Sequence, residues 1–248
     1  MVDQVHDAAA ETEAAALFDA GFALENRGQL AEALRAYDDL VQRFGHLPDP
    51  HVRVKVASAL NGKAWIVSQD GGDEARIAVA DEVIARFADS DDPHLDGQLA
   101  VAMGMKAISV GRLHGSEQEM ALHDQVIQRF GAGTAPLVRE RVAMSLYNKG
   151  CELAKLKRHQ EAVDCYDEVV RRIGTATEQQ LRDVTGMSLF ASGVSLEALK
   201  RRKQAIAVYQ DVINRYGDSD DPQLMAHVRS AGRRLEALSK RRWFNLFG

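Results

Sequence analysis

Several features that mark other classes of protein are rare or absent in this sequence. Only 2 of the 248 residues are cysteine and 6% are aromatic. The period-two alternation with β-branched residues that indicates strands is missing. No run of 18 apolar residues occurs, so we expect no membrane span. The net charge of −5 is mild and argues against a dedicated nucleic-acid-binding protein.

The motifs of catalytic and metal-binding sites are also missing. The sequence contains no nucleophile elbow, P-loop or dinucleotide fingerprint, and its histidines lack the spacing of two ligands on one helix face. Cys151 and Cys165 are expected to be small buried residues rather than a disulfide. Residues 1–16 are acidic and lack the apolar stretch of a signal peptide. We therefore expect a non-catalytic cytoplasmic protein without a metal or a cofactor.

What the sequence does contain is a strict repeat of 43 residues. We use the word column for a set of equivalent positions in successive units. One column pairs arginine with an aromatic or apolar residue, at Arg43-Phe44, Arg86-Phe87, Arg129-Phe130, Arg172-Ile173 and Arg215-Tyr216. A second column holds small residues, at Gly21, Ala64, Ala107, Gly150 and Gly193. A fixed period of this size predicts one structural unit that is copied and stacked into a solenoid, an architecture suited to binding other macromolecules.

Each unit is predicted to form two helices. In the second half of the first unit, an apolar helical stripe is formed by Ala33, Tyr37, Leu40, Val41 and Phe44. The first half of a unit begins with Asp at the N-cap and Pro at the first helical position, as at Asp49-Pro50, Asp92-Pro93 and Asp221-Pro222. Glycine follows most arginine-aromatic pairs and is expected to end the helix with a positive φ, at Gly45, Gly131, Gly174 and Gly217.

These signals predict a single solenoid domain over residues 1–248. Its five repeats cover about 8–45, 50–88, 93–131, 136–174 and 179–217. A further helix at about 222–242 is expected to cap the open end of the stack, because a terminal repeat would otherwise expose an apolar face. An apolar tail follows at residues 243–248. We favour a tail that folds back on the last repeat, and the alternative is a tail that docks on a partner or a membrane surface.

The columns resemble those of tetratricopeptide repeats. In that family the first helix of each repeat is called helix A and the second helix B. A small residue of helix A meets a small residue of helix B, and an aromatic residue follows four positions later. Three units fit this pattern, with Gly21, Ala33 and Tyr37, with Gly150, Ala162 and Tyr166, and with Gly193, Ala205 and Tyr209. The family repeat has about 34 residues, so the unit here is longer. The resemblance implies an all-α, right-handed superhelical solenoid of antiparallel helix pairs.

The second and third units depart from the family pattern. Arg76 and Glu119 occupy the position of the small residue, and Ala80 and His123 occupy the position of the aromatic residue. We expect either looser packing of these helix pairs, a one-residue shift of helix B, or a centre opened for a ligand. His123 falls on an apolar stripe and is expected to be a hydrogen-bonded core histidine.

The resemblance also implies that the A helices line a concave groove. Carried over position by position, one row of the groove is Phe18, Asn61, Gly104, Tyr147, Phe190 and Arg233, and the other is Phe22, Trp65, Ile108, Cys151 and Val194. Gly104 would leave room for an inserted side chain. The alternative is that these residues form the core between repeats. The family's carboxylate clamp is not expected, because only Asn148 fits its positions.

The function that these features favour is a protein–protein interaction scaffold that holds a peptide or helix of a partner in the groove. The alternatives are a nucleic-acid-binding module that uses the basic C-terminal end and a ligand-sensing regulatory subunit of an enzyme complex. Acidic residues dominate residues 1–30 and basic residues dominate residues 229–242. This asymmetry predicts either weak head-to-tail self-association or two solvated ends.

Overall fold

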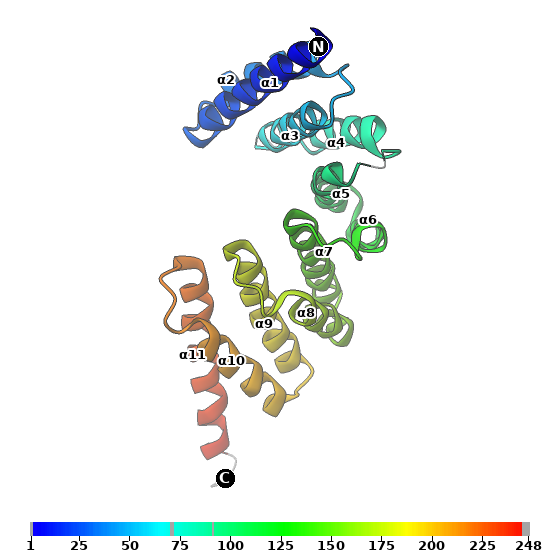
Figure 1. Ribbon diagram of the computed structural model, residues 1–248. Helices are drawn as coiled ribbons and strands as arrows, with labels where there is room; N and C mark the ends of the chain where they lie inside the picture. The colour runs from blue at the N-terminus through cyan, green and yellow to red at the C-terminus, as the bar shows by residue number, and fades with distance from the viewer. Residues whose placement is uncertain (1, 70–71, 91, 245–248) are drawn as a thin grey trace. The chain divides into compact units, whose positions relative to one another are not determined.

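The computed structural model describes residues 2–69, 72–90 and 92–244, and throughout this part of the chain the regular structure is α-helix without any strand (Figure 1). The chain divides into two compact parts, Met1–Arg141 and Val142–Gly248, and each is described by itself. We call these parts the first unit and the second unit, and we call the 43-residue segments repeats. Within the described residues, every helix is too short or too polar to cross a membrane. The predicted tail ends outside the described residues, since residues 245–248 are not among them.

The helices alternate as the repeat predicts. The first unit contains α1 (Val2–Asn26), α2 (Leu30–Phe44), α3 (Pro50–Val67), α4 (Asp73–Phe87), α5 (Pro93–His114) and α6 (Ser116–Phe130). The boundary between the units lies inside α7 (Pro136–Lys155), and the second unit continues with α8 (His159–Ile173), α9 (Gln179–Ala198), α10 (Arg202–Tyr216) and α11 (Pro222–Phe244). Odd-numbered helices are A helices and even-numbered helices are B helices. Each B helix has 15 residues and ends at the second residue of the arginine-aromatic pair, so the predicted helical repeat is confirmed.

The predicted aspartate caps are confirmed at three A helices. Asp49 accepts a hydrogen bond from the backbone N–H of Val52 at 2.9 Å, and Asp92 accepts one from His94 at 2.9 Å. Asp221 does the same for the first turn of α11. The proline that follows each aspartate has no N–H to leave unpaired, so the residue pair fixes the start of the helix.

The predicted positive φ after the B helices is wrong. Gly45, Gly131, Gly174 and Gly217 have φ angles of −65°, −62°, −65° and −60°. Here the chain leaves the helix through a further turn. The backbone N–H of the second residue after the glycine donates to the carbonyl of the residue that precedes the glycine. Such a turn needs a negative φ at the glycine. The left-handed residues lie instead in the turn between helices A and B, at Gly28, Gly115, Lys157 and Lys200.

In the regular repeats, a tyrosine of helix B packs on a glycine of helix A and joins the two helices. A side chain at Gly21 of α1 or Gly62 of α3 would begin 2.6 Å from the ring of Tyr37. The Tyr37 hydroxyl donates a 2.7 Å hydrogen bond to Glu25 at the end of α1. Burial raises the pKa of this phenol, because the charged form would lose its solvation. Only a residue without a side chain leaves enough room for the ring at these crossings.

The same contact occurs twice in the second unit. Gly150 faces Tyr166, and Gly193 faces Tyr209, with closest approaches of 2.5 Å to the position a Cβ would take. The Tyr209 ring is fully buried and its hydroxyl donates to Glu197 at 2.5 Å. The small and aromatic columns therefore describe one interlocking contact between helices A and B.

The arginine-aromatic column links the third and fifth repeats to the repeats before them. The aromatic or apolar member of the pair is buried in every unit, and at the end of α6 and α10 the arginine reaches back across the linker. Arg129 donates to the carbonyl of Ala88, and Arg215 donates to the carbonyl of Gly174 at 2.7 Å. The pair thus combines apolar burial with satisfaction of a carbonyl at the preceding helix end.

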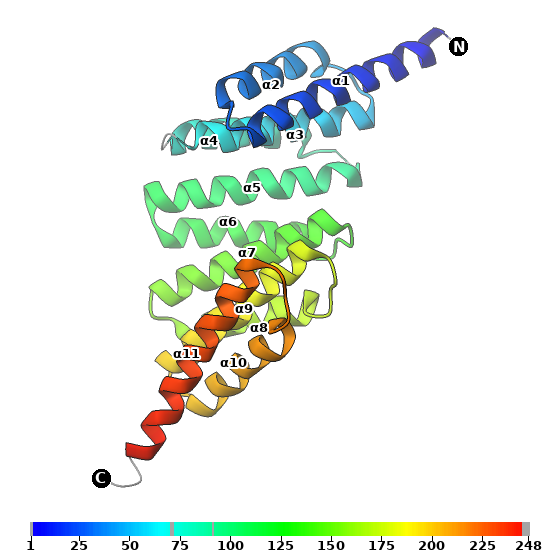
Figure 2. The same ribbon diagram turned by 90° about the vertical axis from the view of Figure 1, so that its left-hand side faces the viewer.

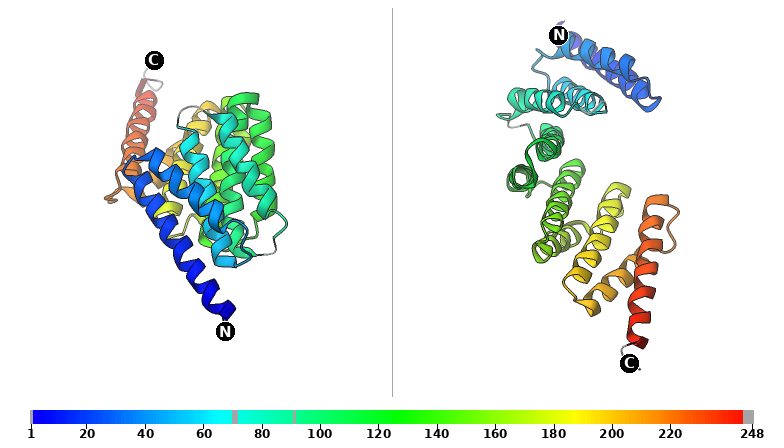
Figure 3. Two further views of the ribbon diagram at one scale, coloured as in Figure 1. Left: turned by 90° about the horizontal axis from the view of Figure 1, so that it is seen from above. Right: turned by 180° about the vertical axis from the view of Figure 1, so that it is seen from behind.

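The A helices of the first unit approach one another more closely than its B helices do. Contacts link α1 to α3 and α3 to α5, whereas within residues 2–69, 72–90 and 92–130 no contact links α2 to α4 or α4 to α6. Figure 2 shows α5 and α6 side by side, and the right panel of Figure 3 shows the same pair nearly end-on. A row of helices that touch lies on the inner side of a curved stack, so the A helices form the inner face of this unit.

Candidate functional site

An exposed aromatic row lies on the A helices of the first unit. Phe22 is 50% exposed and Trp65 is 41% exposed, and they occupy equivalent positions of α1 and α3. Phe18 stacks on Phe22 with ring centroids 6.2 Å apart and planes 8° apart. The ammonium group of Lys55 lies 4.9 Å from the Phe18 ring centroid. We call Phe18, Phe22 and Trp65 the aromatic row. Large apolar side chains that stay in water on adjacent helices are typical of a protein-binding surface.

The row continues along α5 with a small residue. Gly104 is half-buried, and no heavy atom lies within 4 Å of the place where a Cβ would stand. Ile108, one turn later, is also half-buried. No other side chain of the described residues therefore fills the space next to Gly104, and its use by a partner stays a prediction.

Asn61 does not belong to the exposed part of this surface. Its side chain is 5% exposed, and its amide donates to the backbone carbonyl and the side-chain oxygen of Gln98 at 3.0 and 2.8 Å. It holds α3 to α5, as the alternative of an inter-repeat core foresees. The sequence lacks a signal for this, because the partner of a polar residue in the column depends on the neighbouring repeat.

In the second unit, the predicted groove residues are mostly half-buried against tyrosines. Tyr147 lies 6.0 Å from the Tyr166 ring, and Cys151 accepts a 3.6 Å hydrogen bond from the Tyr166 hydroxyl. Burial raises the pKa of Tyr147. Both cysteines are free thiols. Val194 is half-buried as well.

Phe190 is the centre of a second ring cluster in this unit. Its ring lies 5.9 Å from Tyr209 and 5.6 Å from His227 of α11, and the guanidinium of Arg234 lies 5.8 Å from it. Arg233 points into solvent and donates to Ser230 at 3.0 Å. Burial lowers the pKa of His227, because the protonated ring would lose solvation, while Asp183 acts in the opposite direction.

The two divergent repeats place polar side chains in the core of the first unit. Arg76 and Glu119 are 9% and 8% exposed, and His123 is completely buried. Glu119 lies over Gly111, where a side chain on α5 would collide with its carboxylate. Burial lowers the pKa of Arg76, and the positive charge of Arg112 adds to the effect.

The expected hydrogen bonds of His123 are not formed. Its Nε2 lies 3.6 Å from the Glu119 carboxylate, and neither ring nitrogen has a hydrogen-bond partner. The expected one-residue shift of helix B is also absent. Both α4 and α6 have the same length as α2 and begin at the same position of the 43-residue repeat. The polar residues are thus accommodated within the regular repeat.

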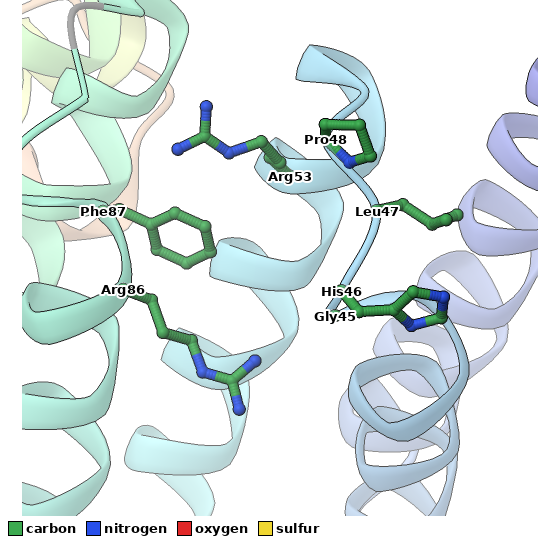
Figure 4. Close-up of a pocket in the computed structure, with 7 residues that line it drawn as sticks. All are labelled: Gly45, His46, Leu47, Pro48, Arg53, Arg86 and Phe87. Atoms are coloured by element: carbon green, nitrogen blue, oxygen red, sulfur yellow. The ribbon is translucent and has the colours of Figure 1, made fainter.

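A shallow pocket of about 450 Å³ lies beside the linker that follows α2, and the sequence does not point to it. It is lined by Gly45, His46, Leu47, Pro48, Arg53, Arg86 and Phe87. Figure 4 shows the guanidinium groups of Arg53 and Arg86 extending on opposite sides of the Phe87 ring. Arg86 forms an ion pair with Glu82 at 2.6 Å. The two cations therefore do not converge on one ligand.

Comparison with known proteins supports the repeat assignment. Two family models, both described as tetratricopeptide repeat, match residues 15–46 and 187–219 in one case and residues 144–173 in the other. These segments are the units that carry glycine, alanine and tyrosine in the expected columns, and the units with Arg76 and Glu119 are not matched. No curated protein matches the sequence. The columns, the helix pairs and the matched segments together show that this chain contains tetratricopeptide repeats.

Proposed function

We propose that this protein is a non-catalytic scaffold that binds an apolar peptide or helix of a partner protein on the A-helix face of its first unit. Tetratricopeptide repeats generally mediate protein–protein interactions and are typically non-catalytic. The observation that carries the proposal is the exposure of Phe22 and Trp65 at equivalent positions of adjacent A helices. A partner that covers the exposed half of such a ring removes apolar surface from water, which favours association.

The chemistry of this face favours a partner with apolar anchor residues. The aromatic row supplies flat apolar surface, and the space at Gly104 lies on the next A helix. Lys55, stacked on Phe18, adds one cation at the edge of the row. Aromatic residues in such positions dominate the energetics of many interfaces, and their truncation costs about 2 kcal/mol or more.

The predicted groove residues of the second unit are proposed as a secondary binding surface of their own. Tyr147 and Phe190 are half-buried against neighbouring tyrosines, so each offers less area than Trp65 does. Arg233 is exposed and supplies a cation there. We therefore expect the first unit to contribute more of the binding energy than the second.

Capture of partners from the native host tests this proposal. The bait is the full chain, and the variants are Phe22→Ala and Trp65→Ala. Leu113→Ala and Leu156→Ala are matched controls, because these leucines are 39% and 42% exposed but lie at the end of α5 and just after the end of α7. Loss of the same captured proteins with both aromatic variants, and retention with both leucine variants, is the expected result. If all four variants capture the same proteins, the groove assignment is wrong.

The head-to-tail association predicted from the charge asymmetry is a separate proposal. It requires an acidic end of one copy to meet the basic end of another, so it weakens with salt over a Debye length of about 10 Å at 0.1 M. Light scattering at low and high salt measures it. A strictly monomeric protein at low salt contradicts it.

A further inference from the structure

A lysine–aspartate pair links consecutive repeats of the first unit. Lys63 of α3 bonds Asp38 of α2 at 2.5 Å, and Lys106 of α5 bonds Asp81 of α4 at 2.6 Å. In each pair the lysine belongs to helix A of one repeat and the aspartate to helix B of the repeat before it. The pairs are equivalent in the 43-residue register, so they form two further columns.

The last pair of repeats lacks the cation of this column. Ser192 of α9 occupies the lysine position, and Asp167 of α8 occupies the aspartate position. The serine hydroxyl donates a long hydrogen bond of 3.5 Å to the carboxylate, and no ion pair of Asp167 is found in the described part of the chain. Burial raises the pKa of Asp167, and the nearby charge of Asp164 adds to this effect while Ser192 opposes it. Asp167 is thus an acid that the repeat pattern normally pairs and that here stays without a cation.

A cavity of about 370 Å³ lies beside this carboxylate. It is lined by Gln160, Val163, Asp167, Leu196, Arg201, Gln204, Ala207 and Val208, which come from α8, α9, α10 and the turn before α10. Val163 and Leu196 are buried and give the cavity an apolar floor. Gln160 also lines the cavity, and its side-chain carbonyl oxygen is a buried acceptor without a hydrogen-bond partner.

We propose that this cavity binds the side chain of a lysine from a partner polypeptide. The ammonium group has three donors and no acceptor. It suits the Asp167 carboxylate, whose one side-chain donor is the Ser192 hydroxyl, and the Gln160 carbonyl oxygen, which has no donor. The four methylene groups of the lysine pack on Val163 and Leu196. The partner thereby supplies in trans the cation that Lys63 and Lys106 supply within the chain.

Arg201 also lines the cavity, and its charge limits the strength of this site. Its side chain makes no hydrogen bond or ion pair among the described residues, so its charge repels an incoming ammonium group. The removal of this charge is therefore expected to strengthen lysine binding, whereas removal of the Asp167 charge is expected to weaken it. The proposal rests on the protein-binding function but concerns a surface separate from the aromatic row.

The test is a titration of the ¹⁵N-labelled full chain with N-acetyl-lysine N-methylamide, followed by two-dimensional NMR. We expect saturable shifts at residues 160–167 and 204–208. The isosteric N-acetyl-norleucine N-methylamide, which lacks the ammonium group, is expected to leave these signals unchanged. Equal shifts with both compounds, or no shifts with the lysine compound, overturn the proposal.

Three substitutions sharpen the titration. Asp167→Asn is expected to weaken lysine binding at least tenfold, Ser192→Lys to block it with an internal ammonium group, and Arg201→Gln to strengthen it severalfold. Asp38→Asn is the matched control, because Asp38 is already paired with Lys63, and it is expected to have no effect. Unchanged affinity in a folded Asp167→Asn variant refutes the site, and this variant is decisive if Ser192→Lys does not fold.

The outcome is separable from that of the groove proposal. Trp65→Ala is expected to leave the affinity for the lysine compound unchanged, because Trp65 belongs to the first unit and the cavity to the second. If Trp65→Ala abolishes partner capture and the lysine compound fails to bind, the groove stands and the lysine site falls. If the lysine compound binds and the aromatic variants capture partners as before, the lysine site stands and the groove falls.

Discussion

The regular repeats and the divergent repeats of this protein reach the same helix boundaries with different cores. In the first repeat, Tyr37 fills the crossing of its helix pair and donates a hydrogen bond to Glu25. In the third repeat, His123 and Glu119 lie at the equivalent crossing without a hydrogen bond between them. Yet α2 and α6 have the same length and start at the same position of the 43-residue repeat. The tyrosine–glycine contact therefore does not set the helix ends. The arginine-aromatic pair at the end of helix B is the feature that these two repeats share.

The largest expected effect is the loss of a core tyrosine from a regular repeat. Tyr209→Ala removes a fully buried ring and its bond to Glu197, and we expect a loss of about 3–5 kcal/mol in the free energy of unfolding. His123→Ala removes a smaller ring whose nitrogens are unpaired, so its cost is expected to be much smaller. Urea unfolding of both variants measures the difference. Equal losses contradict the comparison.

The reverse change is expected to stabilise a divergent repeat. Glu119→Ala with His123→Leu restores the small residue of the column and removes buried polar atoms without partners. Because each such group costs about 1–3 kcal/mol, we expect the double variant to gain on the order of 1–3 kcal/mol. Thermal and urea unfolding report the gain. A less stable double variant means that these polar residues hold the centre together.

The turns between helices A and B offer a smaller comparison. Lys157 and Lys200 of the second unit have φ angles of 61° and 60°, whereas the first repeat has Gly28 at 74°. A left-handed non-glycine residue is strained by about 1–2 kcal/mol, and the greater freedom of glycine in the unfolded chain offsets part of this. We expect Lys157→Gly to raise the free energy of unfolding by about 0.5–1 kcal/mol and Gly28→Lys to lower it. Changes of the opposite sign contradict the account of these turns.

The smallest effect concerns pH. His227 packs on Phe190, and its pKa lies below the ordinary value of about 6.5 because the ring is partly buried. The unfolded chain binds a proton at this histidine more readily than the folded chain, so the contribution is complete above pH 6.5 and is lost as pH falls. We expect unfolding measured between pH 7.5 and 5.5 to show a smaller pH dependence in His227→Gln than in the natural chain. An unchanged dependence assigns the effect to other groups.

Much of the fold follows from the sequence because the columns are local. Asp49-Pro50 and its equivalents fix helix starts, and Gly21 with Tyr37 encodes a contact between neighbouring helices. Contacts between repeats are harder to predict. The burial of Asn61 depends on Gln98 of the next A helix, and the turn that makes the φ of Gly45 negative depends on hydrogen bonds beyond the helix. The missing cation at Ser192 is visible in the sequence only after Lys63 and Asp38 are known to touch.

The affinity of a captured partner for two single variants tests the central claim most directly. A partner captured by the full chain is titrated against Trp65→Ala and against Leu113→Ala, each confirmed to be folded by circular dichroism. The aromatic row predicts at least a tenfold loss of affinity for Trp65→Ala, because about 1.4 kcal/mol corresponds to tenfold and a buried aromatic anchor contributes more than that. It predicts no more than a twofold change for Leu113→Ala. Equal affinities for the two variants, or a greater loss for Leu113→Ala, would contradict the claim that the A-helix face of the first unit binds the partner.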